Sequence, residues 1–304
     1  MKHPFIPAKL LFLLLFTASL SFAQTPVQVV TKVIEKEFAY SEGQRIRLAA
    51  QKADVIVKGW SRSSVSVRLR LIAKHPDRSV AEHEVAYHQY ALKLENGQID
   101  LSNQFVIPQR AAKLQSQLKA VYEVSLPSRM LLTLINSFGD IRLSDIAGDV
   151  SVNFEFGKLT LNDIGGKLTI ISNYGDVDGH NLAAALTIKA EKADVVLQEL
   201  GGTVKIQSQY GRLSSELAST LTSLTIEAAR TEILVVTKRL SDFRFDVSTA
   251  YSEIRLPQEF TSQLSRQSGK QLFKYQLLSR KPEVTIRNSY NTVLIQDDKS
   301  LVGR

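Results

Sequence analysis

The chain has 304 residues, of which 44 % are hydrophobic and 22 % charged, with a formal net charge of +8. This balance excludes general disorder and allows a packed core, in two ordinary domains or one extended one. The absence of cysteine excludes disulfides, thiol catalysis and thiolate metal sites. Because the basic residues are scattered rather than clustered, nucleic acid is not an expected partner.

Residues 1–23 have the features of a secretory signal peptide. Lys2 and Lys9 precede the apolar run Leu10–Phe16, and Ala23 ends a small-residue cleavage site. The run is too short to span a bilayer and no second candidate follows, so we expect no transmembrane span in the mature chain. The alternative is an uncleaved anchor. We therefore expect an exported protein, located in the periplasm, at the cell surface or outside the cell.

Residues 24–120 are expected to form a β-rich capping region with one short helix. A capping-box spacing of Ser79 and Glu82 predicts this helix between Pro76 and Tyr87. The pair Asn96-Gly97 predicts a tight hairpin. Alternating segments predict the strands, at residues 27–30, 32–34, 45–48, 54–57, 65–71, 91–94 and 98–101. Residues 103–119 could form a loop or a short helix.

Three histidines lie in or beside the predicted helix, namely His75, His83 and His88. His83 and His88 are five residues apart, so they do not share a helix face as a metal-binding pair would. We interpret them as solvated helix residues.

A repeat of eighteen residues organises the following segment. Phe138-Gly-Asp-Ile141 recurs as Phe156-Gly-Lys-Leu159 and Tyr174-Gly-Asp-Val177, then in the altered copy Lys192-Ala-Asp-Val195, and again as Tyr210-Gly-Arg-Leu213. A fixed period of this size is typical of stacked units. Each period contains two short alternating strands rich in Val, Ile and Thr.

The repeats predict an all-β fold, a right-handed parallel β-solenoid with coils of about eighteen residues over 121–296. Successive antiparallel hairpins in a meander or sandwich are the alternative. Looser coils follow Tyr210, residues 258–281 form a polar insertion, and Glu283–Ile295 closes the array. Residues 297–304 are expected to be a flexible tail.

The repeats align four aromatic residues in one column, namely Phe138, Phe156, Tyr174 and Tyr210. Such a column could bind sugars, but the alternation of side chains along the strand places Phe156 on the same side as Val152 and Phe154. We therefore predict that the aromatics pack inward or fill a corner, and that the following glycines permit the bend. Two polar columns accompany them. The first contains Asp140, Lys158, Asp176, Asp194 and Arg212, and the second Asp145, Asp163, Asn181 and Glu199. Interleaved bases and solvent offset the carboxylates, so we expect no metal.

Catalytic signals are weak. His180 lies near Asp178 and Asn181 without a serine nucleophile, and the eighteen-residue coils leave almost no loop to build a cleft. The outward file Ser151, Thr169, Thr187, Lys205 and Thr225 is an ordinary exposed ladder, because an ice-binding face needs two threonines per coil. We predict no catalytic, cofactor-binding or metal-binding residues, and the binding residues stay unknown.

Several segments resemble the bacterial "putative adhesin" family of unknown function, chiefly Val121–Pro127, Asn136–Ile141, Ile146–Val150 and Thr285–Tyr290. The resemblance implies an exported, non-enzymatic, β-helical envelope protein. Our leading hypothesis is a binding or structural module with a protein, glycan or cell-wall partner. The alternatives are a β-helical polysaccharide lyase or hydrolase, with a cleft expected near residues 230–281, and an envelope signalling accessory.

Overall fold

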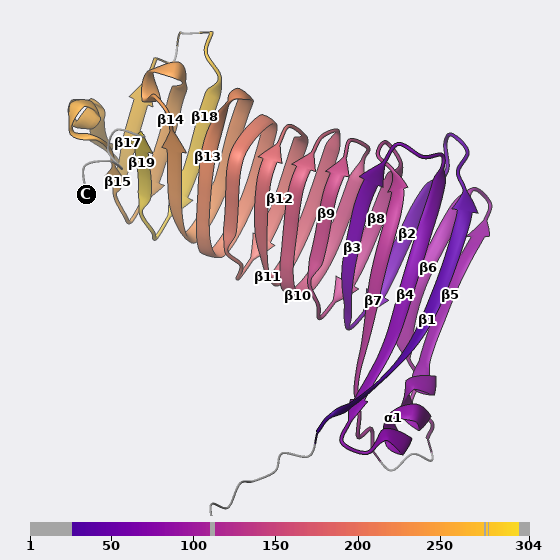
Figure 1. Cartoon of the computed structure of the whole chain (residues 1–304). Coiled ribbons are helices and arrows are strands. Elements are labelled where there is room, and N and C mark those ends of the chain that lie inside the picture. Colours follow the sequence, from indigo (N-terminus) through magenta and orange to yellow (C-terminus); the bar gives the residue numbers. More distant parts are fainter. Residues whose placement is uncertain (1–25, 110–112, 277, 279, 298–304) are drawn as a thin grey trace, which may run out of the picture.

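The described part of the chain forms one long stack of β-strands with a single α-helix at one end (Figure 1). This computed structural model describes residues 26–109, 113–276, 278 and 280–297. The predicted signal peptide (1–23) and residues 298–304 of the predicted tail lie outside the described residues. The all-β prediction is confirmed. Among the described residues, no helix is long and apolar enough to cross a membrane.

The described strands all join one nineteen-stranded sheet that bends around the stack. The strands are β1 Gln28–Ala39, β2 Arg45–Gln51, β3 Ala53–Trp60, β4 Ser64–His75, β5 His88–Glu95, β6 Gln98–Phe105, β7 Gln117–Pro127, β8 Leu131–Ser137, β9 Ile141–Ile146, β10 Val150–Ile164, β11 Lys167–Leu182, β12 Ala185–Glu191, β13 Val195–Thr237, β14 Arg244–Ala250, β15 Ile254–Arg255, β16 Leu264–Gln267, β17 Lys270–Tyr275, β18 Glu283–Ser289 and β19 Val293–Asp297. The helices are α1 Arg78–Glu84 and the 3-10 turns η1 Val85–Tyr87, η2 Leu240–Asp242 and η3 Gln258–Gln263.

Successive repeats pair in parallel with a constant offset. Val150 of β10 lies opposite Leu132 of β8 on one side and Leu168 of β11 on the other. The second half of β10 pairs in the same way, with Leu159 between Ile141 and Val177. Antiparallel hairpins cannot produce these pairs, so the meander alternative is wrong for this region. We call each eighteen-residue circuit a coil. Each coil supplies one segment to a first row, which contains β8 and β12, and one segment to a second row, which contains β9. The long strands β10, β11 and β13 run through both rows.

The core lies between the two rows. Side chains alternate inward and outward along each strand, so equivalent positions of successive coils build buried columns. One such column contains Val152, Ile170, Ile188, Ile206 and Ile226, and each of these side chains is buried. β-Branched residues suit these positions because their restricted rotamers match the extended backbone.

Each regular coil bends sharply at two corners. At both, one non-glycine residue takes a left-handed backbone conformation, such as Phe156 with φ of 52° and Asp163 with φ of 55°. The glycine after the aromatic is required where the coils touch. A Cβ on Gly157, whose φ is 140°, would lie 2.3 Å from the carbonyl oxygen of Gly139 in the preceding coil. The predicted link between glycine and bend therefore holds at Gly139, Gly157 and Gly211, whose φ values are all positive, but not at Gly175.

The ends of the stack do not follow the sequence order. The last coil, β18 and β19, lies between the C-terminal part of β13 (residues 223–237) and the earlier coil formed by β14 and β15 (Figure 1). Residues 283–295 were expected to close the array, and this expectation is wrong. At the other end, β2 and β3 lie between the later strands β6 and β7 and the coil of β8 and β9. Thus both ends insert one coil between two others.

Antiparallel strands terminate each end. β4 pairs with β7 and β1 pairs with β4, while β5 forms the predicted Asn96-Gly97 hairpin with β6. At the far end, the predicted polar insertion contains an ordered hairpin, β16 and β17, that pairs with β14. Helix α1 is capped by Asp77, whose carboxylate accepts a hydrogen bond from the Ser79 N–H. Ser79 itself, predicted as the cap, is therefore the second residue of α1.

Candidate binding surface

The repeated aromatics lie outside the core. Phe156 is 40 % exposed although Phe154, two residues earlier, is buried. The predicted inward packing is therefore wrong. Its physical reason is the left-handed conformation of Phe156, which interrupts the alternation so that Glu155 and Phe156 are both exposed. The placement of these aromatics at a corner is confirmed.

The corner residues form a continuous file along the stack, which we call the corner ladder. Its members, in spatial order, are Lys52, Phe138, Phe156, Tyr174, Lys192, Tyr210, Arg230, Tyr290 and Tyr251. All have φ between 48° and 64°. Consecutive strands of a sheet lie about 4.8 Å apart, so the side chains of neighbouring coils are within reach of one another.

Contacts between these side chains are of two kinds, ring stacking and cation–π pairs. The rings of Phe138 and Phe156 stack 4.9 Å apart, and those of Phe156 and Tyr174 5.2 Å apart. Lys192 lies 4.7 Å from the Tyr174 ring centroid and donates a 2.8 Å hydrogen bond to its hydroxyl. That hydrogen bond raises the pKa of Lys192. Arg230 then lies over both the Tyr210 and Tyr290 rings.

This geometry argues against a row of sugar platforms. A sugar ring packs on the face of an aromatic, but the planes of stacked ladder rings differ by only 8–13°, so neighbours cover those faces. Solvent meets the ring edges instead. The exception is Tyr251, which is 77 % exposed and ends the file with one face against Tyr290.

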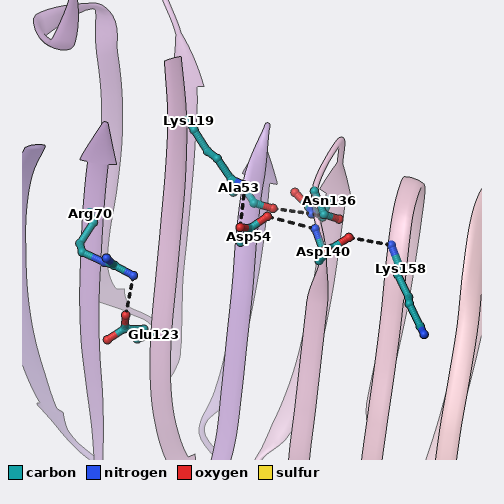
Figure 2. A network of polar contacts seen from close by, with 9 residues as sticks. Ala53, Asp54, Arg70, Lys119, Glu123, Asn136, Asp140 and Lys158 are labelled. Carbon is teal, nitrogen blue, oxygen red and sulfur yellow. Dashed lines mark hydrogen bonds and ion pairs between the residues drawn. The ribbon is translucent and has the colours of Figure 1, made fainter. Parts of the chain in front are cut away.

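Beside the ladder, the first polar column ties coils together through backbone groups. The carboxylate of Asp140 accepts from the backbone N–H of Lys158, and Asp194 likewise accepts from that of Arg212. Asp54 extends the column toward the N-terminus, since it accepts from the Asp140 N–H and pairs with Lys119 at 2.6 Å (Figure 2). These carboxylates therefore satisfy N–H groups at the bend, where a backbone donor would otherwise lack a partner.

The second polar column occupies the other corner. All four of its residues have a left-handed backbone conformation there, namely Asp145, Asp163, Asn181 and Glu199. The Asn181 amide donates a 2.6 Å hydrogen bond to Asp163, and His180 lies 3.7 Å from Glu199. Asp178 pairs with Lys158 at 2.8 Å rather than with His180, and it raises the pKa of that lysine. Within the described residues, no three His, Asp or Glu side chains are grouped to hold a metal ion.

Four carboxylates near residues 230–281, where an enzymatic cleft was expected, are paired with arginines. Asp246 contacts Arg287 at 2.6 Å and Glu232 contacts Arg212 at 3.3 Å. A glycosidase needs two carboxyl groups that flank the scissile bond in a cleft. The Asp246 and Glu232 pairs instead join neighbouring coils.

The three histidines of the N-terminal region have different surroundings. The His75 ring bonds to the backbone of Asp77, and the His83 ring contacts Tyr87 edge-on. His88 is buried in β5 against Phe105, so the prediction that it is a solvated helix residue is wrong. Burial lowers the pKa of His88, and its hydrogen bond with the Ile72 carbonyl opposes this only in part.

A shallow groove of about 480 Å³ lies next to the corner ladder. It crosses the first row over four successive coils, in β11, β12 and two segments of β13. One wall contains Ile171, Lys189, Gln207 and Glu227, and the other Asn173, Glu191, Gln209 and Ala229. Because each wall is one register position repeated over successive coils, the groove runs along the stack. Sequence reasoning missed it, although the small residues Ser172, Ala190 and Ser208 at its floor recur at eighteen-residue spacing.

Comparisons with solved structures give only distant resemblances. A "putative adhesin" from Bacteroides fragilis is 11 % identical, with 88 % of this chain and 97 % of that chain covered and a TM-score of 0.32. A "putative lipid binding protein" from Parabacteroides distasonis is 12 % identical, with coverages of 87 % and 96 % and a TM-score of 0.31. These scores are too low to support a conclusion about fold or function. No curated protein matches the chain.

The family comparison is decisive. The sequence profile of the family described as Toastrack DUF4097 matches residues 43–276, which is most of the chain. The resemblance to the "putative adhesin" family of unknown function is thereby confirmed, and the chain belongs to the Toastrack DUF4097 family.

Proposed function

We propose that this protein is an exported, non-enzymatic module of the cell envelope that binds a partner in the manner of an adhesin. The observation that carries the proposal is the arrangement of its polar groups. Carboxylates of the corners, together with Glu232 and Asp246, contact neighbouring coils, so they maintain the stack. What remains for interaction is a long, regular outer surface.

The groove beside the corner ladder is the proposed contact region. Its amide side chains both donate and accept hydrogen bonds, as a protein backbone, a glycan or a cell-wall polymer also does. Charges of both signs line it, through Lys189, Glu191 and Glu227. A groove that repeats one pattern along an axis suits an extended partner. Family membership and the signal-peptide pattern support the envelope setting.

The architecture that we propose for this module is a right-handed β-solenoid. Connections between parallel strands of one sheet are right-handed in nearly all proteins, and the coils here make such connections. Residues 24–120 would serve as the cap at one end and residues 121–296 as the repeat region.

Binding of isolated envelope fractions to the purified protein tests the function. The triple variant N173A/Q207A/Q209A removes groove amides, and we expect it to lose at least tenfold in apparent affinity, about 1.4 kcal/mol. The matched control is N162A/Q198A, which removes amides from the outer face of the second row. Equal binding by both variants would exclude the groove, and turnover of any envelope polysaccharide would overturn the non-enzymatic assignment.

A further inference from the structure

Strand β1 leaves one long edge of the sheet open. Within the described residues, β1 pairs over its twelve residues with β4, from Gln28 opposite His75 to Ala39 opposite Ser64, and with no other strand. In an antiparallel pair every second residue directs its N–H and C=O groups away from the partner strand. The outer edge of β1 therefore presents a row of backbone donors and acceptors.

The other end of the stack is protected against such pairing. There the outermost strands are short, with four residues in β16 and two in β15. Short edge strands are one of the ways in which proteins prevent unwanted sheet extension. β1 lacks this protection, since it has twelve residues and no proline.

The first half of β1 is also apolar on its outer face. Val27, which directly precedes β1, is 59 % exposed, and Val29 and Val33 are 55 % and 47 % exposed. Together with Thr31, they occupy every second position and so lie on one face. The acidic residues of that face, Glu35 and Glu37, lie in the second half. Charges that would discourage pairing are therefore absent from the outer face between Val27 and Val33.

This face is complementary to itself in the antiparallel direction. With Thr31 of two copies on a two-fold axis, each Val29 lies opposite the other copy's Val33, and each Val27 opposite Glu35. Two valine pairs then flank a threonine pair, and cross-strand pairs of β-branched residues stabilise sheets. A two-fold arrangement also closes after two copies, so it covers the open edge of β1 in both.

We propose that β1 is a homodimer interface, in which the β1 strands of two copies pair antiparallel about Thr31 and join their second rows into one continuous sheet. The partner is thus a second copy of this chain. The interface lies at the N-terminal end of the stack and leaves the groove accessible, so it is independent of the proposed function.

Cysteine crosslinking tests the register, because the natural chain contains no cysteine. Directly opposed residues have Cα atoms about 4.5–5.5 Å apart, which a disulfide can bridge. We expect the T31C variant to form a disulfide-linked dimer under mild oxidation. V27C, on the same face directly before the strand, should not, because the two copies of Val27 lie eight residues, or about 26 Å, apart along the paired strands. Equal crosslinking of the two variants, or none by T31C, overturns the proposal.

Analytical ultracentrifugation over a concentration series tests the association itself. The V29K variant places a charge opposite Val33 and should weaken dimerisation at least tenfold. V27K places its charge opposite Glu35 and should leave the dimer intact. Since all these positions are exposed in one chain, circular dichroism should show unchanged folding. A natural protein that remains monomeric at every concentration, or equal weakening by the two lysine variants, would contradict the interface.

Discussion

The regular coils between Leu131 and Leu213 and the two ends of the stack differ in how the chain orders its strands. In the regular part, each coil lies beside the coil that precedes it in sequence. At each end, one coil is inserted between two others, β2–β3 near the N-terminus and β18–β19 near the C-terminus. The same strand pairing thus serves two different chain paths.

The difference has a consequence for stability. Coils that follow one another can form by local addition, as in other repeat proteins. An inserted coil cannot, because its neighbours on both sides must also be in place. Closing the long connections costs chain entropy before the new contacts form. In return, the outermost coil is joined to the rest of the stack through the inserted coil. The outermost coil therefore cannot separate from the stack while the inserted coil stays paired.

Removal of the inserted coil should have the largest effect on this arrangement. A chain that stops at Pro282 lacks β18 and β19, which are the parallel neighbours of β14 and β15. We expect residues 238–282 to lose protection from proteolysis while the regular coils keep theirs, with a clear fall in melting temperature. A chain that stops at Asp297 is the control and should behave as the natural protein. Retained protection of β14 would show that it can pair directly with β13.

Substitutions of two phenylalanines in one strand distinguish the contribution of the core to stability from that of the corner ladder. Phe154→Ala empties a buried position and should cost about 3–5 kcal/mol of unfolding free energy. Phe156→Ala removes a half-exposed ring stacked between Phe138 and Tyr174 and should cost about 1 kcal/mol. Urea denaturation measures both. Similar losses would mean that Phe156 contributes to the core after all.

The sequence was informative where a pattern reports a local requirement. Alternation and the eighteen-residue period predicted the buried columns and their parallel pairing, and Asn96-Gly97 predicted a hairpin. The position of Phe156 was mispredicted because parity assumes an unbroken strand, and one left-handed residue shifts everything after it. The inserted coils were missed because Glu283–Tyr290 has the same pattern as any other coil, which defines its shape but not its neighbours. The groove depends on packing across four strands, which no single strand reveals.

The corner glycines of the regular coils allow a sharper test of close stacking. Gly157→Ala would place a methyl group 2.3 Å from the Gly139 carbonyl oxygen, at a φ that disfavours any side chain. We expect a loss of about 3 kcal/mol. Gly165→Ala is the matched control, since its nearest neighbour would lie 3.8 Å away. It should change the stability by less than about 1 kcal/mol, and a comparable loss at both positions would contradict the stacking argument.

The smallest effect concerns pH and should be confined to the N-terminal end. Burial against Phe105 lowers the pKa of His88 in the folded chain, whereas the unfolded chain has the usual value near 6.5. Below about pH 6.5 the unfolded state therefore binds a proton that the folded state resists. The free energy of unfolding should fall as the pH drops from about 7.5 to 5.5, and this contribution should be constant at higher pH.

His88→Gln isolates this contribution, because glutamine can still donate to the Ile72 carbonyl and does not titrate. We expect the variant to show a flatter stability profile across this range, measured by urea denaturation at each pH. His83→Gln changes an exposed histidine and should reproduce the natural profile. Glu84 does not contribute to the pH dependence in this range. Burial alone would raise the pKa of Glu84, but hydrogen bonds from Ser116 and Gln115 lower it. The contribution of Glu84 to stability is therefore lost only at more acidic pH. An unchanged slope in His88→Gln would assign the pH dependence to other groups, and a slope reduced equally by both variants would make it a property of surface charge rather than of the buried end.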